Sequence, residues 1–206
     1  MNTETLLTEE RTALDSVLMG LVGLDERYVA EFRQVMFRRA LSKKDFLITE
    51  GNTCNFIGIV VSGVLRSFIR GGETAEFNND FYFEWDFVSA YTSFLTSRPT
   101  NCNIQALTDV NIVYITSEQY QALISRDNEW LKLGKYIAET FFIRKCKRET
   151  SFLRNTAAKR LESVLQLYPG IEQRVSQYHI ASYLGVKPES LSRIKLLTYI
   201  NKKGQV

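Results

Sequence analysis

Short apolar runs separated by turn residues follow an N-terminal helical segment. Residues 5–33 carry leucine and valine at near-helical spacing, which predicts helix there. From Val35 to Ile115 the runs are short and rich in β-branched and aromatic residues, and turn signals such as Gly71-Gly72 divide them. Many short strands at regular spacing predict a β-barrel or a β-sandwich.

Helical periodicity begins at Ser117, the expected N-cap, and lasts nearly to the end of the chain. A long helix is predicted over residues 127–150, with apolar residues on more than one face. One face can pack on the barrel and the other on a second copy, so we expect a homodimer with Ile137 and Phe141 in its interface. The alternative is an ordinary buried helix. A further helix is predicted over residues 156–168, closed by a Pro-Gly pair.

Residues 176–194 match a helix-turn-helix pattern. Ala181 is small enough for two helices to approach each other, and Gly185 accepts the positive φ that a sharp turn needs. Pro188 suits the first turn of the second helix, where its missing N–H costs nothing. The apolar residues that would join the helices are Ile180, Leu184, Val186, Leu191 and Ile194. The alternative is a plain helical hairpin in an α domain.

Polar side chains of the second helix lie between those apolar positions. They can reach base edges and phosphates in a major groove, and they are Lys187, Glu189, Ser190, Ser192, Arg193 and Lys195. Residues 144–206 hold 13 of the 26 Lys and Arg but only 4 of the 23 Asp and Glu. This end of the chain would attract a polyanion, and we expect the basic residues at 144–148 to add general DNA affinity.

The order of strands, long helix and C-terminal helix-turn-helix resembles the cyclic-AMP receptor protein (Crp/Fnr) family over nearly the whole chain. The segments 180–186 and 188–194 resemble the subgroup that is common in Bacteroidetes. The resemblance implies an α+β fold with three parts. These are a cyclic-nucleotide-binding-like β-barrel (double-stranded β-helix) over residues 1–126, a dimerisation helix over 127–150 and a helix-turn-helix domain over 151–206.

The same resemblance assigns roles and partners. In the family a Glu, a small hydroxyl residue and an Arg of the recognition helix read DNA, which implies that Glu189, Ser190 and Arg193 do so here. Glu can accept from a cytosine amino group, and Arg can bond guanine O6 and N7. The implied partners are double-stranded DNA, a second copy of the chain and RNA polymerase.

The candidate effector pocket departs from the phosphate-binding cassette of the family's cyclic-nucleotide binders. Ser89-Ala90 stands where the cassette has Gly-Glu, and Thr100-Asn101 stands where it has Arg-Ser or Arg-Thr. Ala90 cannot accept a ribose hydrogen bond, and Thr100 cannot neutralise a phosphate. Arg98 could do so only after a register shift. We therefore expect that cyclic AMP does not bind.

Aromatic residues are unusually dense around this cassette. The pocket can be empty, filled by aromatic side chains or adapted to another ligand, and a role in the barrel core is expected. The aromatic residues concerned are Phe81, Tyr82, Phe83, Trp85, Phe87, Tyr91 and Phe94.

The remaining composition excludes several classes of protein. No apolar run is long enough to span a membrane, and the N-terminus lacks the pattern of a secretory signal. Cys54, Cys102 and Cys146 are scattered, which fits reduced thiols in a cytoplasm and not an iron–sulfur cluster. The single histidine, His179, cannot supply the metal ligands of a cupin-type enzyme. We expect no catalysis, no cofactor and no metal.

The chain after the recognition helix is short. Residues 196–206 cannot form a full β-hairpin wing, although Lys202-Lys203-Gly204 could leave a basic tail. The sequence therefore predicts a sequence-specific DNA-binding transcription regulator that does not respond to cyclic AMP, with an unknown effector. The alternative is a small-molecule-binding sensor module whose DNA binding is weak or vestigial.

Overall fold

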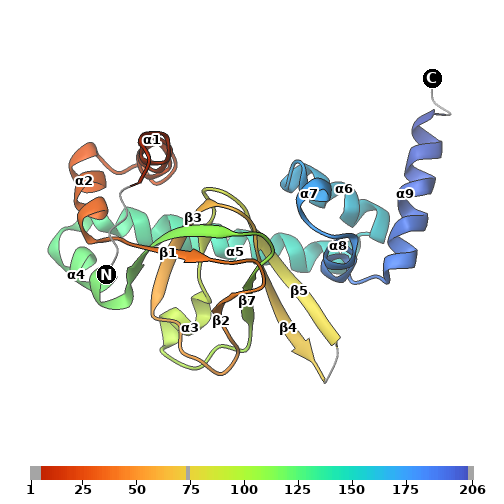
Figure 1. The fold of residues 1–206 in the computed structure, drawn as a ribbon, viewed down its shortest axis with the longest axis horizontal. Helices are drawn as coiled ribbons and strands as arrows, with labels where there is room; N and C mark the ends of the chain where they lie inside the picture. The colour runs from red at the N-terminus through yellow and green to blue at the C-terminus, as the bar shows by residue number, and fades with distance from the viewer. Residues whose placement is uncertain (1–5, 73–74, 204–206) are drawn as a thin grey trace. The chain divides into compact units, whose positions relative to one another are not determined.

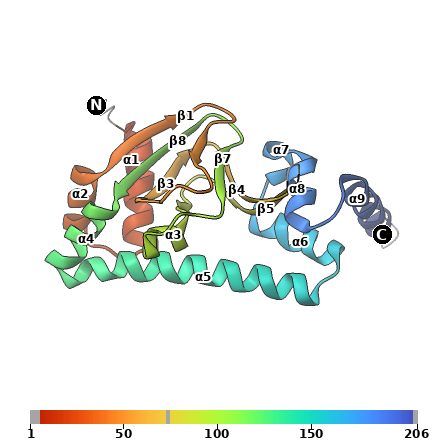
Figure 2. The ribbon, with the colours of Figure 1, turned by 90° about the horizontal axis from the view of Figure 1, so that it is seen from below.

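The computed structural model describes residues 6–72 and 75–203, with side chains up to residue 197. The architecture combines two antiparallel β-sheets, a long helix and a set of C-terminal helices (Figures 1 and 2). This confirms the predicted fold class. The strands form a jelly-roll-like arrangement of two sheets that do not close into a barrel.

The described chain divides into two compact units. The first contains the residues up to Ser67 together with Phe81–Phe142. The second contains the segment Phe68–Asp80 and the residues from Ile143 onward. The division passes through three elements: β4 (Leu65–Gly71), β5 (Ala75–Tyr82) and α5 (Leu131–Arg154).

Antiparallel pairing organises both sheets. One sheet has the order β1-β8-β3-β6, with β1 (Phe37–Leu41), β8 (Val110–Thr116), β3 (Phe56–Ser62) and β6 (Phe87–Val88). The other has the order β2-β7-β4-β5, with β2 (Phe46–Ile48) and β7 (Asn103–Ala106). In the first sheet Ile59 pairs with Val113, and both residues are at most 1% exposed. Nearly every residue of β3 is buried, so both of its faces are covered.

Short helices complete the first unit. The predicted N-terminal helical region consists of α1 (Thr8–Ser16), a π-helical turn (Val17–Leu21) and α2 (Glu26–Val35). Three further helices are α3 (Tyr91–Thr96), α4 (Ser117–Arg126) and the 3₁₀ turn η2 (Asn128–Trp130) before α5. The N-cap of α4 is Thr116 and not the expected Ser117, because the Thr116 hydroxyl accepts the Gln119 N–H at 3.2 Å.

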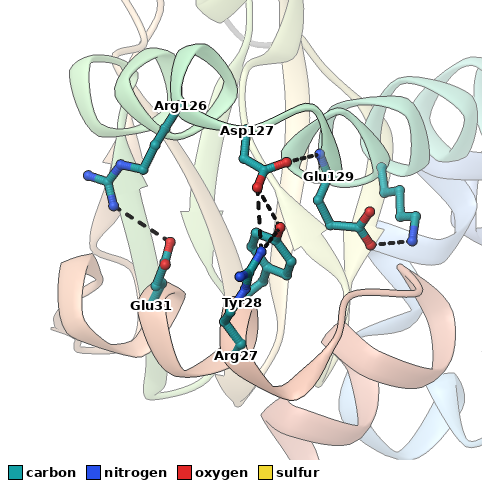
Figure 3. A network of polar contacts seen from close by, with 7 residues as sticks. Arg27, Tyr28, Glu31, Arg126, Asp127 and Glu129 are labelled. Carbon is teal, nitrogen blue, oxygen red and sulfur yellow. Dashed lines mark hydrogen bonds and ion pairs between the residues drawn. The ribbon is translucent and has the colours of Figure 1, made fainter.

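A polar network ties α2 to the junction between α4 and α5 (Figure 3). The Tyr28 hydroxyl donates to the Asp127 carboxylate at 2.6 Å, and the Glu129 N–H donates to the same carboxylate at 3.0 Å. The Glu129 N–H, followed by the Tyr28 hydroxyl, lowers the pKa of the Asp127 carboxyl below its ordinary value. Arg126 and Glu31 form an ion pair at 3.6 Å beside them. These contacts fix where α5 begins within the first unit.

The inward face of α5 carries the residues that we expected in a dimer interface. Ile137 is fully buried in the core of the first unit, next to Leu133. Phe141 is partly buried and its ring stacks on Tyr91 at 5.0 Å between centroids. The expectation that Ile137 contacts a second copy is therefore wrong, because its side chain is fully buried within its own chain. A contact of the partly buried Phe141 with a second copy stays a prediction.

A different face of α5 is apolar and exposed. Leu131 is 53% exposed and Phe142 is 68% exposed, and Ala138 is exposed between them. These residues are seven and four positions apart, which places them on one face of an α-helix. This outward face, defined by Leu131, Ala138 and Phe142, is the part of α5 that a second copy could cover.

The second unit is helical apart from its hairpin segment. Its helices are α6 (Ala157–Leu167), α7 (Ile171–Arg174), α8 (Gln177–Leu184) and α9 (Pro188–Lys203). The helix expected over residues 156–168 is confirmed, with Thr156 as its N-cap. Its core contains Leu161, Val164, Tyr168, Ile171, Val175, Ile180, Ala181, Leu184 and Leu191.

Lys202 and Lys203 belong to α9, and Gly204 lies outside the described residues. The described residues after α8 contain no strand, so they form no wing.

Candidate nucleic-acid interface

Helices α8 and α9 form the predicted helix-turn-helix. The Ser176 hydroxyl caps α8 by accepting the His179 N–H at 3.4 Å. Gly185 ends the helix in the left-handed region, with φ +67°, as its sequence position predicted. The Val186 N–H then donates to the Ala181 carbonyl at 3.0 Å, which closes the turn. Three residues after Gly185, Pro188 begins α9.

Replacing Gly185 by alanine should lower the free energy of unfolding of the second unit by about 1–2 kcal/mol, because a Cβ is disfavoured at positive φ. The added Cβ would also lie 2.8 Å from the Phe152 ring, which must shift. Chemical denaturation followed by circular dichroism measures the change. Gly20→Ala is the control, since its Cβ would meet nothing within 4 Å and its φ is not positive. Equal stabilities for the two variants would contradict the turn assignment.

Most of the predicted DNA-contacting side chains are accessible. Lys187, Glu189, Ser190 and Arg193 are exposed. Glu189 and Arg193 are four positions apart, so the two side chains lie on one face of α9, one turn apart. Their exposure leaves carboxylate, hydroxyl and guanidinium groups available to base edges.

Two further candidate residues have contacts within the second unit. The Ser192 side chain is exposed, and its hydroxyl donates to the Pro188 carbonyl at 3.2 Å along the helix. The Lys195 ammonium pairs with the Glu172 carboxylate of α7, and the Lys195 side chain is 27% exposed. Lys195 therefore joins α9 to α7, and the ion pair competes with any phosphate contact.

The basic cluster at 144–148 is divided between inward and outward positions. Arg148 donates to the Tyr183 carbonyl at 3.0 Å, and its guanidinium lies over the Tyr183 ring at 4.1 Å. Arg144 donates to the Asp80 carboxylate at 3.0 Å. Only Lys145 and Lys147 are exposed. The two arginines thus hold the second unit together, which the charge pattern alone did not reveal.

Sequence reasoning missed Asn78 and Asp80, which lie about a hundred residues before α8. Asn78 is 1% exposed, and Asp80 is partly buried. The Tyr168 hydroxyl donates to the Asp80 carboxylate at 2.7 Å, and burial raises the pKa of Tyr168 well above its ordinary value. The only signal was the polar run 78–80 inside the strand-rich region from Val35 to Ile115, which indicates partners outside a sheet.

The cassette residues are engaged within the first unit. Ser89 is buried, and its hydroxyl donates to the Phe56 carbonyl at 2.9 Å. Ala90 is 5% exposed and is the residue before α3. Thr100 is 7% exposed, and its hydroxyl oxygen accepts the Cys102 N–H at 3.1 Å. The Ser89 and Thr100 hydroxyls therefore both have hydrogen-bond partners within the first unit.

The other two cassette residues face solvent. Arg98 and Asn101 are both exposed. The backbone carbonyl of Arg98 accepts from the Ser93 hydroxyl, which holds the loop while the guanidinium extends outward. The expectation that Arg98 could reach a phosphate only after a register shift stays a prediction.

Aromatic side chains occupy the space where α3, α4 and α5 meet. Tyr91 stacks on Phe141, and Phe94 meets Tyr120 edge-to-face at 5.4 Å. Burial raises the pKa of both tyrosines above the ordinary value. A Cβ on Gly134 of α5 would lie 2.4 Å from the Tyr120 hydroxyl, so the Tyr120 side chain would have to shift to make room for it. Two hollows on the first unit, of about 290 and 380 Å³, are lined by residues outside the cassette.

No group of three or more His, Cys, Asp or Glu side chains is placed to hold a metal ion among the residues with described positions. No helix in the described part of the chain is both long and apolar enough to cross a membrane.

Comparison with known proteins agrees with this architecture. The family model of the cyclic nucleotide-binding domain matches residues 38–127. A CooA mutant from Carboxydothermus hydrogenoformans is 21% identical, with a TM-score of 0.68 over 93% of this chain and 85% of that chain. The chain therefore shares the fold of this solved structure. No curated protein matches the sequence.

Two more solved structures share the Crp/Fnr architecture. FixK2 from Bradyrhizobium japonicum is 18% identical, with a TM-score of 0.69 over 82% of this chain and 86% of that chain. The catabolite activator protein of Thermus thermophilus is 22% identical, with a TM-score of 0.55 over 92% and 88% of the two chains. These likenesses establish the fold. The Bacteroidetes subgroup and the domain limits 1–126, 127–150 and 151–206 stay predictions.

Proposed function

We propose that this chain is a homodimeric, sequence-specific DNA-binding transcription regulator of the Crp/Fnr type that does not respond to cyclic AMP. The observation that carries the proposal is the second helix of the helix-turn-helix. Its first two turns expose Glu189, Ser190 and Arg193, and Lys187 precedes them. Helices that read a major groove present this combination of groups.

Charge supports the same assignment. Lys145, Lys147, Lys187 and Arg193 are exposed, and all four belong to the second unit. Exposed cations on one module raise its affinity for any duplex, and base-contacting groups then select among sequences. A cytoplasmic site of action, RNA polymerase as a further partner and the absence of catalysis belong to this proposal.

The dimer follows from the outward face of α5. Phe142 is 68% exposed on the same helix face as the exposed Leu131 and Ala138. Exposure of this apolar face to water is unfavourable unless another apolar surface covers it. A two-fold dimer would place two copies of α9 on successive half-sites of a near-palindromic site.

Selection of bound duplexes from a random pool, repeated with and without metabolite extract, tests the function. We expect a near-palindromic consensus bound at least about a thousandfold more tightly than scrambled DNA at physiological salt. The rival is a sensor module with vestigial DNA binding. It would yield no consensus in either arm, while the extract would still change the protein's thermal stability.

Cyclic AMP and cyclic GMP should not bind with a dissociation constant tighter than about 1 mM, because the charge-assisted bonds that hold a ribose and a cyclic phosphate have no counterpart here. Ala90 replaces the glutamate, Thr100 replaces the arginine, and the Thr100 hydroxyl is already bonded to Cys102. Isothermal titration calorimetry measures the affinity. Micromolar binding that disappears in Arg98→Ala would instead establish the register shift.

A further inference from the structure

The strand β5 has an edge that another element of the second unit completes. It is the last strand in the order β2-β7-β4-β5, so one row of its backbone groups has no neighbouring strand. The segment Phe68–Asp80, which holds most of β5, belongs to the same compact unit as α6–α9. We call this segment the hairpin arm.

Ser182 of α8 satisfies two backbone groups of the arm with one hydroxyl. The Asn78 N–H donates to the Ser182 hydroxyl oxygen at 2.9 Å. The same hydroxyl donates to the Glu76 carbonyl at 2.7 Å. A serine hydroxyl can donate once and accept at the same time, so this side chain takes the place that a neighbouring strand would have.

Asn78 makes further hydrogen bonds to the helices. The Asn78 side-chain amide donates to the His179 backbone carbonyl at 2.8 Å. The Asn78 backbone carbonyl accepts from the Arg148 guanidinium of α5 at 2.9 Å. Arg148 also donates to the Tyr183 carbonyl at 3.0 Å. Because Asn78 is 1% exposed, these bonds are shielded from competing water. The side chain thus joins the arm to the first helix of the helix-turn-helix.

A second contact lies two residues further along the strand. The Asp80 carboxylate accepts from the Tyr168 hydroxyl at 2.7 Å and from Arg144 at 3.0 Å. The side chains of Asp80 and Arg144 are 17% and 15% exposed. The arm is therefore held at Asn78 by α8 and at Asp80 by the end of α6 and by α5.

We propose that the hairpin arm is a positioning element of the DNA-binding module, and that Asn78 and Asp80 are positioning residues for DNA recognition. The inference rests on the proposed DNA-binding function. Helix α8 contacts α9, and Ile180, Leu184 and Leu191 of these helices are buried, so the arm sets the orientation of the recognition helix by holding α8. Neither residue contacts DNA itself.

Asn78→Ala tests the proposal, and Asn79→Ala is its matched control because Asn79 is the adjacent, exposed asparagine. We expect Asn78→Ala to bind the selected duplex about tenfold more weakly and scrambled DNA almost unchanged, since misplacement affects base contacts more than phosphate contacts. Simple loss of folded protein would weaken both duplexes alike. Asn79→Ala should match the wild type on both.

Hydrogen exchange on the free protein gives a second readout. Amides of α8 should exchange about tenfold faster in Asn78→Ala and in Ser182→Ala than in the wild type, whereas amides of α6 should not change. If Asn78→Ala and Asn79→Ala agree in both measurements, the positioning role is refuted while the proposed function stands. If the wild type selects no duplex at all, the proposed function fails and the inference fails with it.

Discussion

Arg193→Ala should weaken binding to the selected duplex by about 5- to 150-fold, which corresponds to about 1–3 kcal/mol for one good base contact. Arg193 is exposed on α9, one turn beyond Glu189, and its guanidinium can bond guanine O6 and N7 together. Binding to scrambled DNA should fall far less, because a base contact adds little where the base is wrong. A titration of both duplexes at several salt concentrations measures the two losses.

Lys187→Ala is the control for Arg193→Ala. Lys187 is exposed just before α9, and a phosphate contact there acts alike on all sequences. This variant should weaken both duplexes together and reduce the salt slope by about one unit. Lys195 is a poorer control, because its ion pair with Glu172 also joins α9 to α7. Equal losses on both duplexes for Arg193→Ala would remove Arg193 from the specificity role.

Phe142→Glu should convert the protein to monomers at micromolar concentration. Burial of an unpaired carboxylate in the interface would cost about 3 kcal/mol or more, which raises the dimer dissociation constant at least roughly a hundredfold. Phe142 is 68% exposed within its own chain, so the substitution should leave the fold intact. Sedimentation or light scattering measures the mass. DNA affinity should fall as well, since a monomer engages one half-site.

Leu95→Glu is the matched control for the dimer. Leu95 is 61% exposed on α3 and does not belong to the outward face of α5. The Leu95→Glu substitution introduces the same charge on the first unit and should leave the measured mass that of a dimer. A wild-type protein that is monomeric at micromolar concentration would contradict the dimer. So would a Phe142→Glu protein that remains dimeric.

Local sequence signals were sufficient to predict the two helices and the turn of residues 176–194. Gly185, Pro188 and Ala181 each meet a backbone or steric requirement that depends on the nearest few residues. The sequence likewise shows that the cassette lacks its glutamate and arginine, since Ala90 and Thr100 stand at those positions. Packing cannot give these two side chains a charge. The sequence also determined the mixed α and β class, since short β-rich runs and longer helical runs follow one another along the chain.

Tertiary structure decided which side chains are available for function. The sequence treated Arg144 and Arg148 as part of a basic surface, but Asp80 and Asn78 bind them from far along the chain. It also assigned Ile137 to a dimer interface, whereas Ile137 is buried in the core of the first unit. Hydrophobic periodicity shows how wide an apolar stripe is, but the partner of each part of the stripe depends on contacts between distant segments. Such contacts leave no local pattern, so only the folded chain reveals that Glu76 and Asn78 of β5 bind α8.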